Sequence, residues 1–447
     1  MIDYSLFDKY SHEYFVNNFI LPLQEDDKYL YLAICKDSRL DNIKEKFTRK
    51  LKFKEIDIRE MKFLLSEIKL KKELYNLLTK QNENINNENL TKVFFDKIIA
   101  YAIRNRASDI HIESNLQNLV FRFRIDGTLK TFFTLKSIYA KQVSSYVKLI
   151  SNLDITQNRL PQDSRFKLNI DNSNYDFRVS ILPIIDGESI VIRVLDSKNS
   201  NKTLDNLGFS PHIISELNEA INLKQGLILV AGPTGSGKTT TIYSLLKLLN
   251  SDKRKIITVE DPVEYKIQNI QQIAVDNKIG LTFNSILKNI LRQDPDVLLI
   301  GEIREEESLN IALQASLTGH LVISSIHSNS ALQTISRLVD LKADKFLLST
   351  SLKYILSQRL VLSYCKSCDN KGCEKCNFTG YFDRLSLGEI IKIDENISSM
   401  LLKKDSYDLI KEYLIKNNYI DIFKDGMIKV SEKLTSKEEI YKVINYE

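Results

Sequence analysis

A glycine-rich segment carries the clearest chemical signal in the sequence. Residues 232–239 read Gly-Pro-Thr-Gly-Ser-Gly-Lys-Thr and fit G-x-x-x-x-G-K-[ST], a pattern typical of loops that bind nucleotide phosphates. The apolar run Leu227–Ala231 leads into this segment, and the helical pattern Thr240–Leu249 follows it. The glycines let backbone N–H groups converge on phosphates, and the helix N-terminus adds partial positive charge. We therefore predict a site for ATP and Mg²⁺.

Two residues of this loop have specific expected roles. Lys238 is expected to reach the β- and γ-phosphates, and the Thr239 hydroxyl is expected to ligate Mg²⁺. The structural alternative is a glycine-rich turn without a ligand, which the intact strand and helix on either side disfavour. The predicted nucleotide-binding residues of the loop are Gly232, Pro233, Thr234, Gly235, Ser236, Gly237, Lys238, Thr239 and Thr240.

A second apolar strand ends in an acid. The run Asp296–Gly301 is followed by Glu302, which is our first choice for orienting or deprotonating the attacking water. Proteins with this type of loop usually carry aspartate where Gly301 stands, so the common metal-binding carboxylate is missing. Other acids must then contribute.

A third strand supplies candidates for that contribution. The run Lys255–Glu260 leads into Asp261 and, three residues later, Glu264. Ligands bind at the carboxyl ends of the strands in open α/β sheets, so these acids are expected near the nucleotide. Glu260 and Asp261 are assigned to nucleotide binding. Ordinary surface charge is the alternative for each acid.

Two of the five histidines flank one apolar run. His320 precedes Leu321–Ile326, and His327 follows it. We predict that His327 senses the γ-phosphate or forms a hydrogen bond with the catalytic acid. The alternative is that both histidines satisfy backbone groups.

Four of the five cysteines form two C-x2-C pairs, Cys365 with Cys368 and Cys373 with Cys376. Thiolates at this spacing can share one tetrahedral Zn²⁺, and four protein ligands would make the zinc structural. The spacing does not match the bacterial ferredoxin pattern, and disulfides or free thiols are further alternatives. Such clustering in a cysteine-poor chain indicates a reducing compartment, so we expect a cytoplasmic protein.

The elements that must position these groups alternate between strands and helices. Segments such as Thr239–Leu249 and Leu309–Leu317 have helical patterns and lie between short apolar strands, which is typical of a parallel sheet flanked by helices. A helix at Val93–Arg106 precedes a set of short alternating strands. Polar stretches at 81–89 and 197–202 separate these regions. The predicted domains are 1–80, 90–200, 203–360, a zinc-binding loop at 361–384 and a helical region at 385–447.

Composition limits the classes of function. The 447 residues include 43% hydrophobic and 27% charged residues, which is ordinary for a globular protein of two or three domains. The net charge of +5 is small, and no basic stripe with interleaved aromatic residues is present, so stable direct binding of nucleic acid is not expected. No apolar run approaches the ~18 residues of a membrane span.

Taken in order, the motifs resemble those of the hexameric secretion ATPases that drive type II secretion and type IV pilus assembly. Residues 232–239 resemble the Walker A motif of that family, 259–264 its Asp box and 292–304 its atypical Walker B motif, glycine included. Residues 318–331 resemble its His box. Upstream motifs in 108–193 are similar to its second N-terminal domain.

The resemblance implies a fold and further site residues. It implies a RecA-like ATPase domain, preceded by a small α/β domain and a PAS-like α+β domain. ATP is expected between the PAS-like and RecA-like domains. Arg124, Arg178 and Arg193 stand in matching motifs and are candidates for stabilising γ-phosphate charge in cis or in trans. By the same resemblance, Glu264 joins Glu302 as a candidate that acts on the water.

The resemblance also implies partners. The family forms homo-hexamers that work at the cytoplasmic face of the inner membrane, bound to a polytopic platform protein and to a partner of the N-terminal regions. Three points stay open: whether the machine serves secretion, pilus assembly or DNA uptake, which symmetry the ring has, and which acid is the main base. A nucleic-acid translocase with a RecA-like fold and a non-hydrolysing scaffold are the alternative functions.

Overall fold

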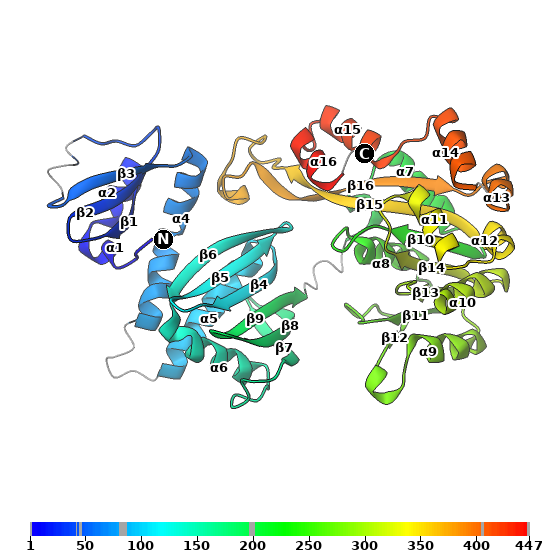
Figure 1. Ribbon diagram of the computed structural model, residues 1–447, viewed down its shortest axis with the longest axis horizontal. Coiled ribbons are helices and arrows are strands. Elements are labelled where there is room, and N and C mark those ends of the chain that lie inside the picture. The colour runs from blue at the N-terminus through cyan, green and yellow to red at the C-terminus, as the bar shows by residue number, and fades with distance from the viewer. Residues whose placement is uncertain are drawn as a thin grey trace. The chain divides into compact units, whose positions relative to one another are not determined.

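The computed structural model divides into two compact units (Figure 1). One contains Met1–Asp196 and Cys365–Phe382, and the other contains Ser197–Tyr364 and Asp383–Glu447. The structure describes residues 2–41, 43, 47–79, 87–195, 202–403 and 406–444. Most of the two predicted polar linkers, residues 81–86 and 197–201, therefore lies outside the described residues.

The first unit begins with a three-stranded sheet of order β1-β2-β3, in which β1 pairs antiparallel and β3 parallel with β2. Short helices precede this sheet, and a long helix follows it. Their bounds are α1 Leu6–Lys9, α2 His12–Asn18, β1 Ile20–Glu25, β2 Tyr29–Ile34, β3 Lys50–Glu55 and α4 Ile58–Thr79.

The same unit contains a six-stranded antiparallel sheet of order β6-β5-β4-β9-β8-β7. Residues along its strands alternate between buried and exposed, so one face packs on a core and the other meets solvent. The bounds are α5 Asn87–Arg104, β4 Ala107–Ser114, β5 Asn118–Ile125, β6 Thr128–Lys136, η1 Ser137–Tyr139, α6 Ala140–Ile150, β7 Gln162–Ile170, β8 Ser173–Ile184 and β9 Gly187–Leu195.

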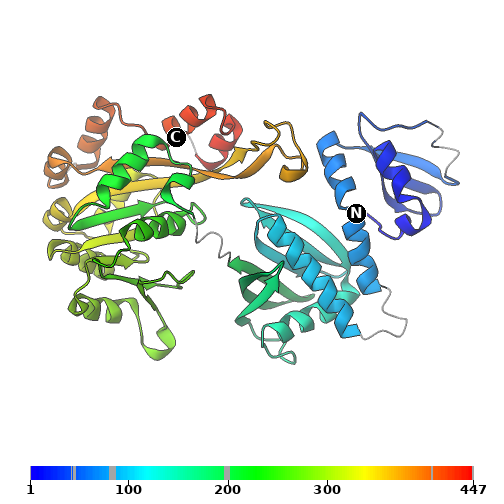
Figure 2. The ribbon, with the colours of Figure 1, turned by 180° about the vertical axis from the view of Figure 1, so that it is seen from behind.

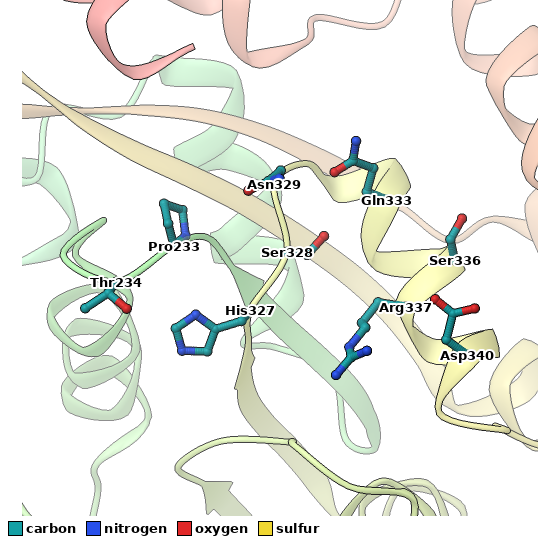
Figure 3. Close-up of a pocket in the computed structure, with 9 residues that line it drawn as sticks. All are labelled: Pro233, Thr234, His327, Ser328, Asn329, Gln333, Ser336, Arg337 and Asp340. Carbon is teal, nitrogen blue, oxygen red and sulfur yellow. The ribbon is translucent and has the colours of Figure 1, made fainter. Parts of the chain in front are cut away.

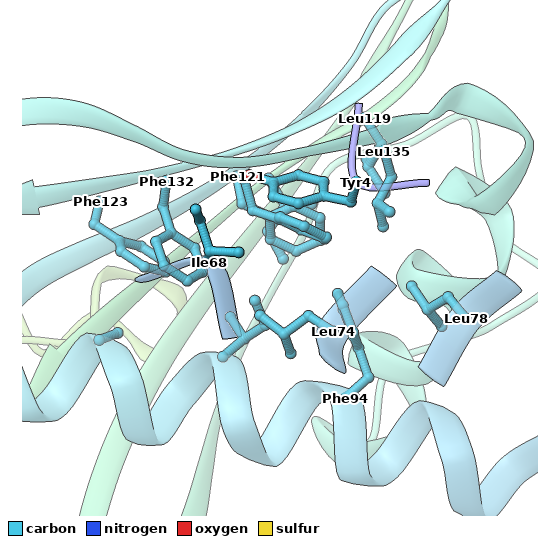
Figure 4. Close-up of a cluster of buried hydrophobic side chains, with 14 of the residues drawn as sticks. Tyr4, Ile68, Leu74, Leu78, Phe94, Leu119, Phe121, Phe123, Phe132 and Leu135 are labelled. Carbon is cyan, nitrogen blue, oxygen red and sulfur yellow. The ribbon is translucent and has the colours of Figure 1, made fainter. Parts of the chain in front are cut away.

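One hydrophobic core runs through both of these sheets and the helices between them. In Figure 4, Leu74 and Leu78 of α4 lie near Phe94 of α5 and below the aromatic side chains of the six-stranded sheet, among them Phe121. Tyr4, close to the N-terminus, belongs to the same cluster, and its ring packs in a tilted orientation against the ring of Phe133. The regions predicted as 1–80 and 90–200 therefore share one core rather than each burying its own.

The second unit is built on a seven-stranded sheet of order β12-β11-β13-β14-β10-β15-β16. The strands from β12 to β15 pair in parallel. Every residue of the four strands β10, β11, β13 and β14 is buried, as expected for a sheet covered on both faces. The strands are β10 Gly226–Ala231, β11 Ile256–Glu260, β12 Gln271–Ala274, β13 Val297–Ile300, β14 Leu321–Ile326, β15 Leu352–Tyr364 and β16 Tyr381–Lys392.

Helices cover both faces of this sheet (Figure 2), and a hydrophobic core lies on each face. Alternate residues of β10 divide between them, Leu229 in one core and Ile228 in the other. Helices α7 and α8 contribute to one core and α9 to α12 to the other. The helices are η3 Leu204–Asn206, α7 Pro211–Ala220, α8 Lys238–Leu249, η4 Asn277–Ile279, α9 Phe283–Ile290, η5 Leu291–Gln293, α10 Glu306–Leu317, α11 Ala331–Asp340, α12 Lys345–Ser351, α13 Glu395–Leu401, α14 Ser406–Lys416, α15 Ile422–Ser431 and α16 Lys437–Val443. The short helix η6 Glu374–Cys376 belongs to the first unit.

This arrangement confirms the predicted mixed α/β fold with a parallel sheet, and it corrects one boundary. Residues 385–392 lie in β16, where the sequence was read as the start of a helical region. Residues 385–391 are all buried, and such a run cannot be distinguished from a buried helix by periodicity alone. Helices begin only at Glu395. Within the described part of the chain, no helix combines the length and the apolar character that a membrane span requires.

Candidate nucleotide-binding site

The predicted phosphate loop connects β10 to α8, as the motif requires. Gly232, Gly235 and Gly237 all have positive φ angles, of 151°, 78° and 90°. A Cβ atom at position 232 would lie 2.5 Å from the Ser236 Oγ and 2.7 Å from the Gln358 carbonyl oxygen. The first glycine is thus required both by its backbone conformation and by close packing.

Lys238, the first residue of α8, is held against this loop. Its Nζ donates to the carbonyl oxygens of Gly232 at 2.7 Å and Pro233 at 3.0 Å. Burial lowers the pKa of Lys238, and the nearby Glu302 carboxylate opposes that effect. Thr239, the predicted Mg²⁺ ligand, is exposed at the start of the helix.

Glu302 follows β13 and meets the residue predicted to contact it. His327 Nε2 lies 3.1 Å from one carboxylate oxygen of Glu302, and Arg304 Nη2 lies 2.7 Å from the other. The Glu302 side chain is 20% exposed, so it is partly screened from water but still accessible. His320 lies at the other end of β14, where its Nδ1 is 2.9 Å from the Ala315 carbonyl oxygen. Of the two histidines, only His327 therefore contacts Glu302.

The backbone around Gly301 explains why no aspartate stands there. The Gly301 N–H donates to the Val259 carbonyl oxygen at 2.8 Å. A Cβ at position 301 would lie 3.0 Å from that same oxygen and 3.3 Å from the Glu260 Cα. The Ser325 hydroxyl donates to the Gly301 carbonyl oxygen at 2.7 Å and fixes the turn from the side of β14.

The acids at the end of β11 differ in their surroundings. Glu260 is buried, and its carboxylate accepts hydrogen bonds from the hydroxyls of Tyr243 and Thr258 and from the amide of Gln272. Burial and this carboxylate together raise the pKa of Tyr243. The Glu260 carboxylate is thus already hydrogen-bonded to other residues of the protein, whereas Asp261 and Glu264 are exposed.

A pocket of about 440 Å³ adjoins the phosphate loop. Pro233 and Thr234 line one side, and polar residues of α11, among them Arg337, line the other. His327 lies between the phosphate loop and α11 in Figure 3. The pocket thus brings the loop and the histidine that contacts Glu302 to one surface.

The three predicted arginines lie in the first unit, on the exposed face of the six-stranded sheet. Strand register places five side chains directly opposite one another in a line: Arg124, Asp109, Arg193, Arg178 and Arg165. Asp109 lies 3.0 Å from Arg193 and 3.7 Å from Arg124. Among the described residues, no ion pair is found for Arg178 or Arg165. We call the four arginines the arginine row.

The four clustered cysteines bring their sulfur atoms together in the first unit. All four Sγ atoms lie within 4.8 Å of one another, with individual separations of 3.8–3.9 Å. Zn–S bonds of about 2.3 Å in a tetrahedron place sulfur atoms about 3.8 Å apart, whereas a disulfide needs about 2.05 Å. The geometry fits a tetrahedral metal and does not fit disulfides. The residues are Cys365, Cys368, Cys373 and Cys376.

Comparison with known proteins decides the family. Residues 83–442 match the family described as Type II/IV secretion system protein. The chain belongs to this family. It is 42% identical over 373 residues to the type II secretion system protein E of Dickeya dadantii, covering 78% of the chain and 75% of the relative. It is 39% identical over 371 residues to the type II secretion system ATPase E of Vibrio cholerae, with coverages of 77% and 74%.

A solved structure supports the same fold. The pilus retraction motor PilT, determined with bound ADP, superposes with a TM-score of 0.57 at 27% identity, covering 78% of the chain and 97% of PilT. The secretion ATPase family and its mixed α/β fold are thus established for the chain.

Four residues that contact the phosphate loop, Glu302, the loop after β14 or the arginine row were not predicted from the sequence. Arg304 pairs with Glu302, and Arg165 extends the arginine row. Gln358 and Arg359 of β15 contact the phosphate loop and the loop after β14. The sequence does indicate Gln358 and Arg359, because they are polar residues within the largely apolar segment 355–361. Arg165, in contrast, is recognisable only once the strand register is known.

Proposed function

We propose that the chain binds ATP with Mg²⁺ and hydrolyses it as one subunit of a homo-hexameric motor. The motor would power assembly of a type II secretion pseudopilus or a type IV pilus, or would serve DNA uptake. The family supports this proposal, since the relative from Vibrio cholerae is named a type II secretion system ATPase.

The arrangement around Glu302 carries the proposal. This carboxylate is held between His327 and Arg304 and acts electrostatically on Lys238 of the phosphate loop. An acid fixed beside the phosphate-binding lysine can orient or deprotonate a water for attack on the γ-phosphate. A scaffold that only binds nucleotide has no need for such a fixed acid.

Further roles are proposed for the neighbouring groups. Lys238 would bind the β- and γ-phosphates, and Thr239 would ligate Mg²⁺. Glu264, with its exposed carboxylate, is the second candidate for the base, and Asp261 would assist in binding the metal. Glu260 would act more indirectly, because its carboxylate is already bound by Tyr243 and Thr258.

The arginines Arg124, Arg178 and Arg193 are proposed to stabilise charge on the γ-phosphate, in cis or in trans. Arg178 suits this role well, because its guanidinium is exposed and unpaired among the described residues. The four cysteines would hold a structural Zn²⁺, since all four ligand positions are filled by protein.

The proposed partners follow from the family. The ring would bind a polytopic platform protein of the inner membrane and would associate with that membrane peripherally, from the cytoplasm. Stable direct contact with nucleic acid is not part of the proposal.

Steady-state ATPase activity of the purified chain, measured with its mass by light scattering, tests the proposal. Glu302→Gln is expected to lower kcat by a factor of about 10² or more, because the base is lost while binding is retained. Glu305→Gln, an exposed acid three residues away, serves as the matched control and should keep its activity.

Two results would contradict the proposed motor function. A monomer that binds ATP without hydrolysing it, also in the presence of membranes and the platform's cytoplasmic domain, would favour the scaffold. Activity stimulated mainly by nucleic acid would favour the translocase.

A further inference from the structure

Strand β15 runs beside the phosphate loop and contributes a buried glutamine to it. Ala231, the last residue of β10, pairs with Ser357, so the loop begins next to Gln358. The Gln358 Nε2 donates to the Ser236 carbonyl oxygen at 2.7 Å. The same nitrogen would lie 3.0 Å from a Cβ at Gly237. Gln358 therefore contacts the loop where its backbone turns into α8, beside the positive-φ residue Gly237.

This contact is shielded from water. Gln358 has no exposed surface, and the Ser236 side chain is buried as well. Within the described structure, neither the Gln358 Oε1 nor the Ser236 Oγ has a hydrogen-bond partner. A buried carbonyl that loses its donor is left unsatisfied, since water cannot replace the donor. The Gln358 amide is thus a specific support of the loop's backbone.

The next residue of the strand supports a different loop. Arg359 donates from Nη2 to the Asn329 carbonyl oxygen at 2.8 Å and from Nη1 to the Gln358 carbonyl oxygen at 3.1 Å. Asn329 lies two residues after His327, whose Nε2 is 3.1 Å from Glu302. Arg359 thus ties the position of the histidine loop to β15.

We propose that Gln358 and Arg359 are positioning residues with separate tasks in the nucleotide site. Gln358 fixes the phosphate loop and thereby governs nucleotide affinity. Arg359 fixes the loop that carries His327 and thereby governs the rate of the chemical step through Glu302. The inference rests on the proposed ATPase function, but it assigns two residues of β15 that belong to no phosphate-binding motif.

The separate effects expected on affinity and on rate make the test specific. Gln358→Met keeps the size of the side chain and removes the donor. We expect about tenfold weaker binding of a fluorescent ATP analogue, with kcat at saturating ATP within about twofold of the unaltered chain. Gln358→Leu also lacks a donor and should weaken binding about as much.

Arg359→Lys keeps the charge but loses the planar fork, so only one of the two carbonyls can be reached. We expect kcat to fall about tenfold, with binding of the analogue within about twofold. Ser357→Ala is the matched control, because Ser357 is equally buried on β15 and makes no hydrogen bond to either loop. Circular dichroism and light-scattering mass verify that each variant is folded and assembled.

The outcomes separate the inference from the proposed function. If the unaltered chain neither binds nor hydrolyses ATP, the proposed function itself is wrong. If that chain is active and both Gln358 variants bind as it does, Gln358 only fills space and its assignment is wrong. If the Gln358 and Arg359 variants lose affinity and rate by equal factors, the two residues have no separate tasks and the inference is overturned.

Discussion

Gly232 and Ser236 of the phosphate loop are buried and closely packed, whereas the arginine row is largely exposed and carries mainly one sign of charge. In the loop, Gly232 leaves no room for a side chain, and Gln358 supplies a single amide donor. In the row, Arg193, Arg178 and Arg165 stand directly opposite one another across three strands. Like charges in that position destabilise a sheet.

This difference in packing and charge predicts opposite effects of substitution on stability. Specific contacts hold the buried backbone of the loop, so a change there removes a native interaction and should lower stability. The row is internally repulsive, and a bound polyphosphate would supply the missing negative charge. A change at Arg178 or Arg165, for which no ion pair is found among the described residues, should therefore lower activity and raise the stability of the free protein.

Substitution of Arg178, at the centre of the arginine row, is expected to change activity strongly. Arg178→Thr should lower kcat by a factor of about 10² to 10³, if Arg178 stabilises charge on the γ-phosphate. The same change removes two repulsive pairs, each of about 0.2–1 kcal/mol, and places a good strand former in β8. Thermal unfolding of the nucleotide-free protein should shift upward. A parallel loss of activity and stability would show that Arg178 holds the sheet together instead.

The opposite sign of stability change is expected beside the loop. Gly301→Ala places a Cβ about 3.0 Å from the Val259 carbonyl oxygen, which must be pushed away. We expect a loss of about 1–3 kcal/mol in the free energy of unfolding and a fall in kcat of about tenfold, because Glu302 moves with its neighbour. Denaturant unfolding and ATPase assays measure both. Unchanged stability would mean that the two strand ends separate easily, and the contrast with the row would fail.

The sequence predicted the loop better than the row for a physical reason. Residues 232–239 form a local motif, so their types and spacing suffice to predict a strand, a turn and a helix N-terminus. The pairing of His327 with Glu302 was also predictable, since both follow buried strands of one parallel sheet. In contrast, the alignment of Arg165 with Arg178 depends on the register of a hairpin, and one residue of slip reverses every side chain.

Long-range packing hid other features as well. Gln358 reaches Ser236 across 122 positions of the sequence, and no local pattern indicates such a contact. The buried environment of Glu260 was missed because its donors come from α8, β11 and β12 together. An acid at a strand end can point to a ligand or into the protein, and only the side-chain packing distinguishes the two.

A weaker effect is expected at Arg165, at the edge of the arginine row. Arg165 lies on β7 with Arg178 as its one cross-strand neighbour, so Arg165→Thr should relieve a single repulsive pair and gain about 0.5 kcal/mol. If Arg165 also contacts phosphate, kcat/KM for ATP should fall about three- to tenfold. Lys167→Thr is the matched control: Lys167 lies on the same strand and face but pairs with Asp176 at 3.0 Å. It should gain no stability and keep its activity. Equal behaviour of the two variants would mean that the row ends at Arg178, because Arg165 would then be one more solvated charge on an exposed strand.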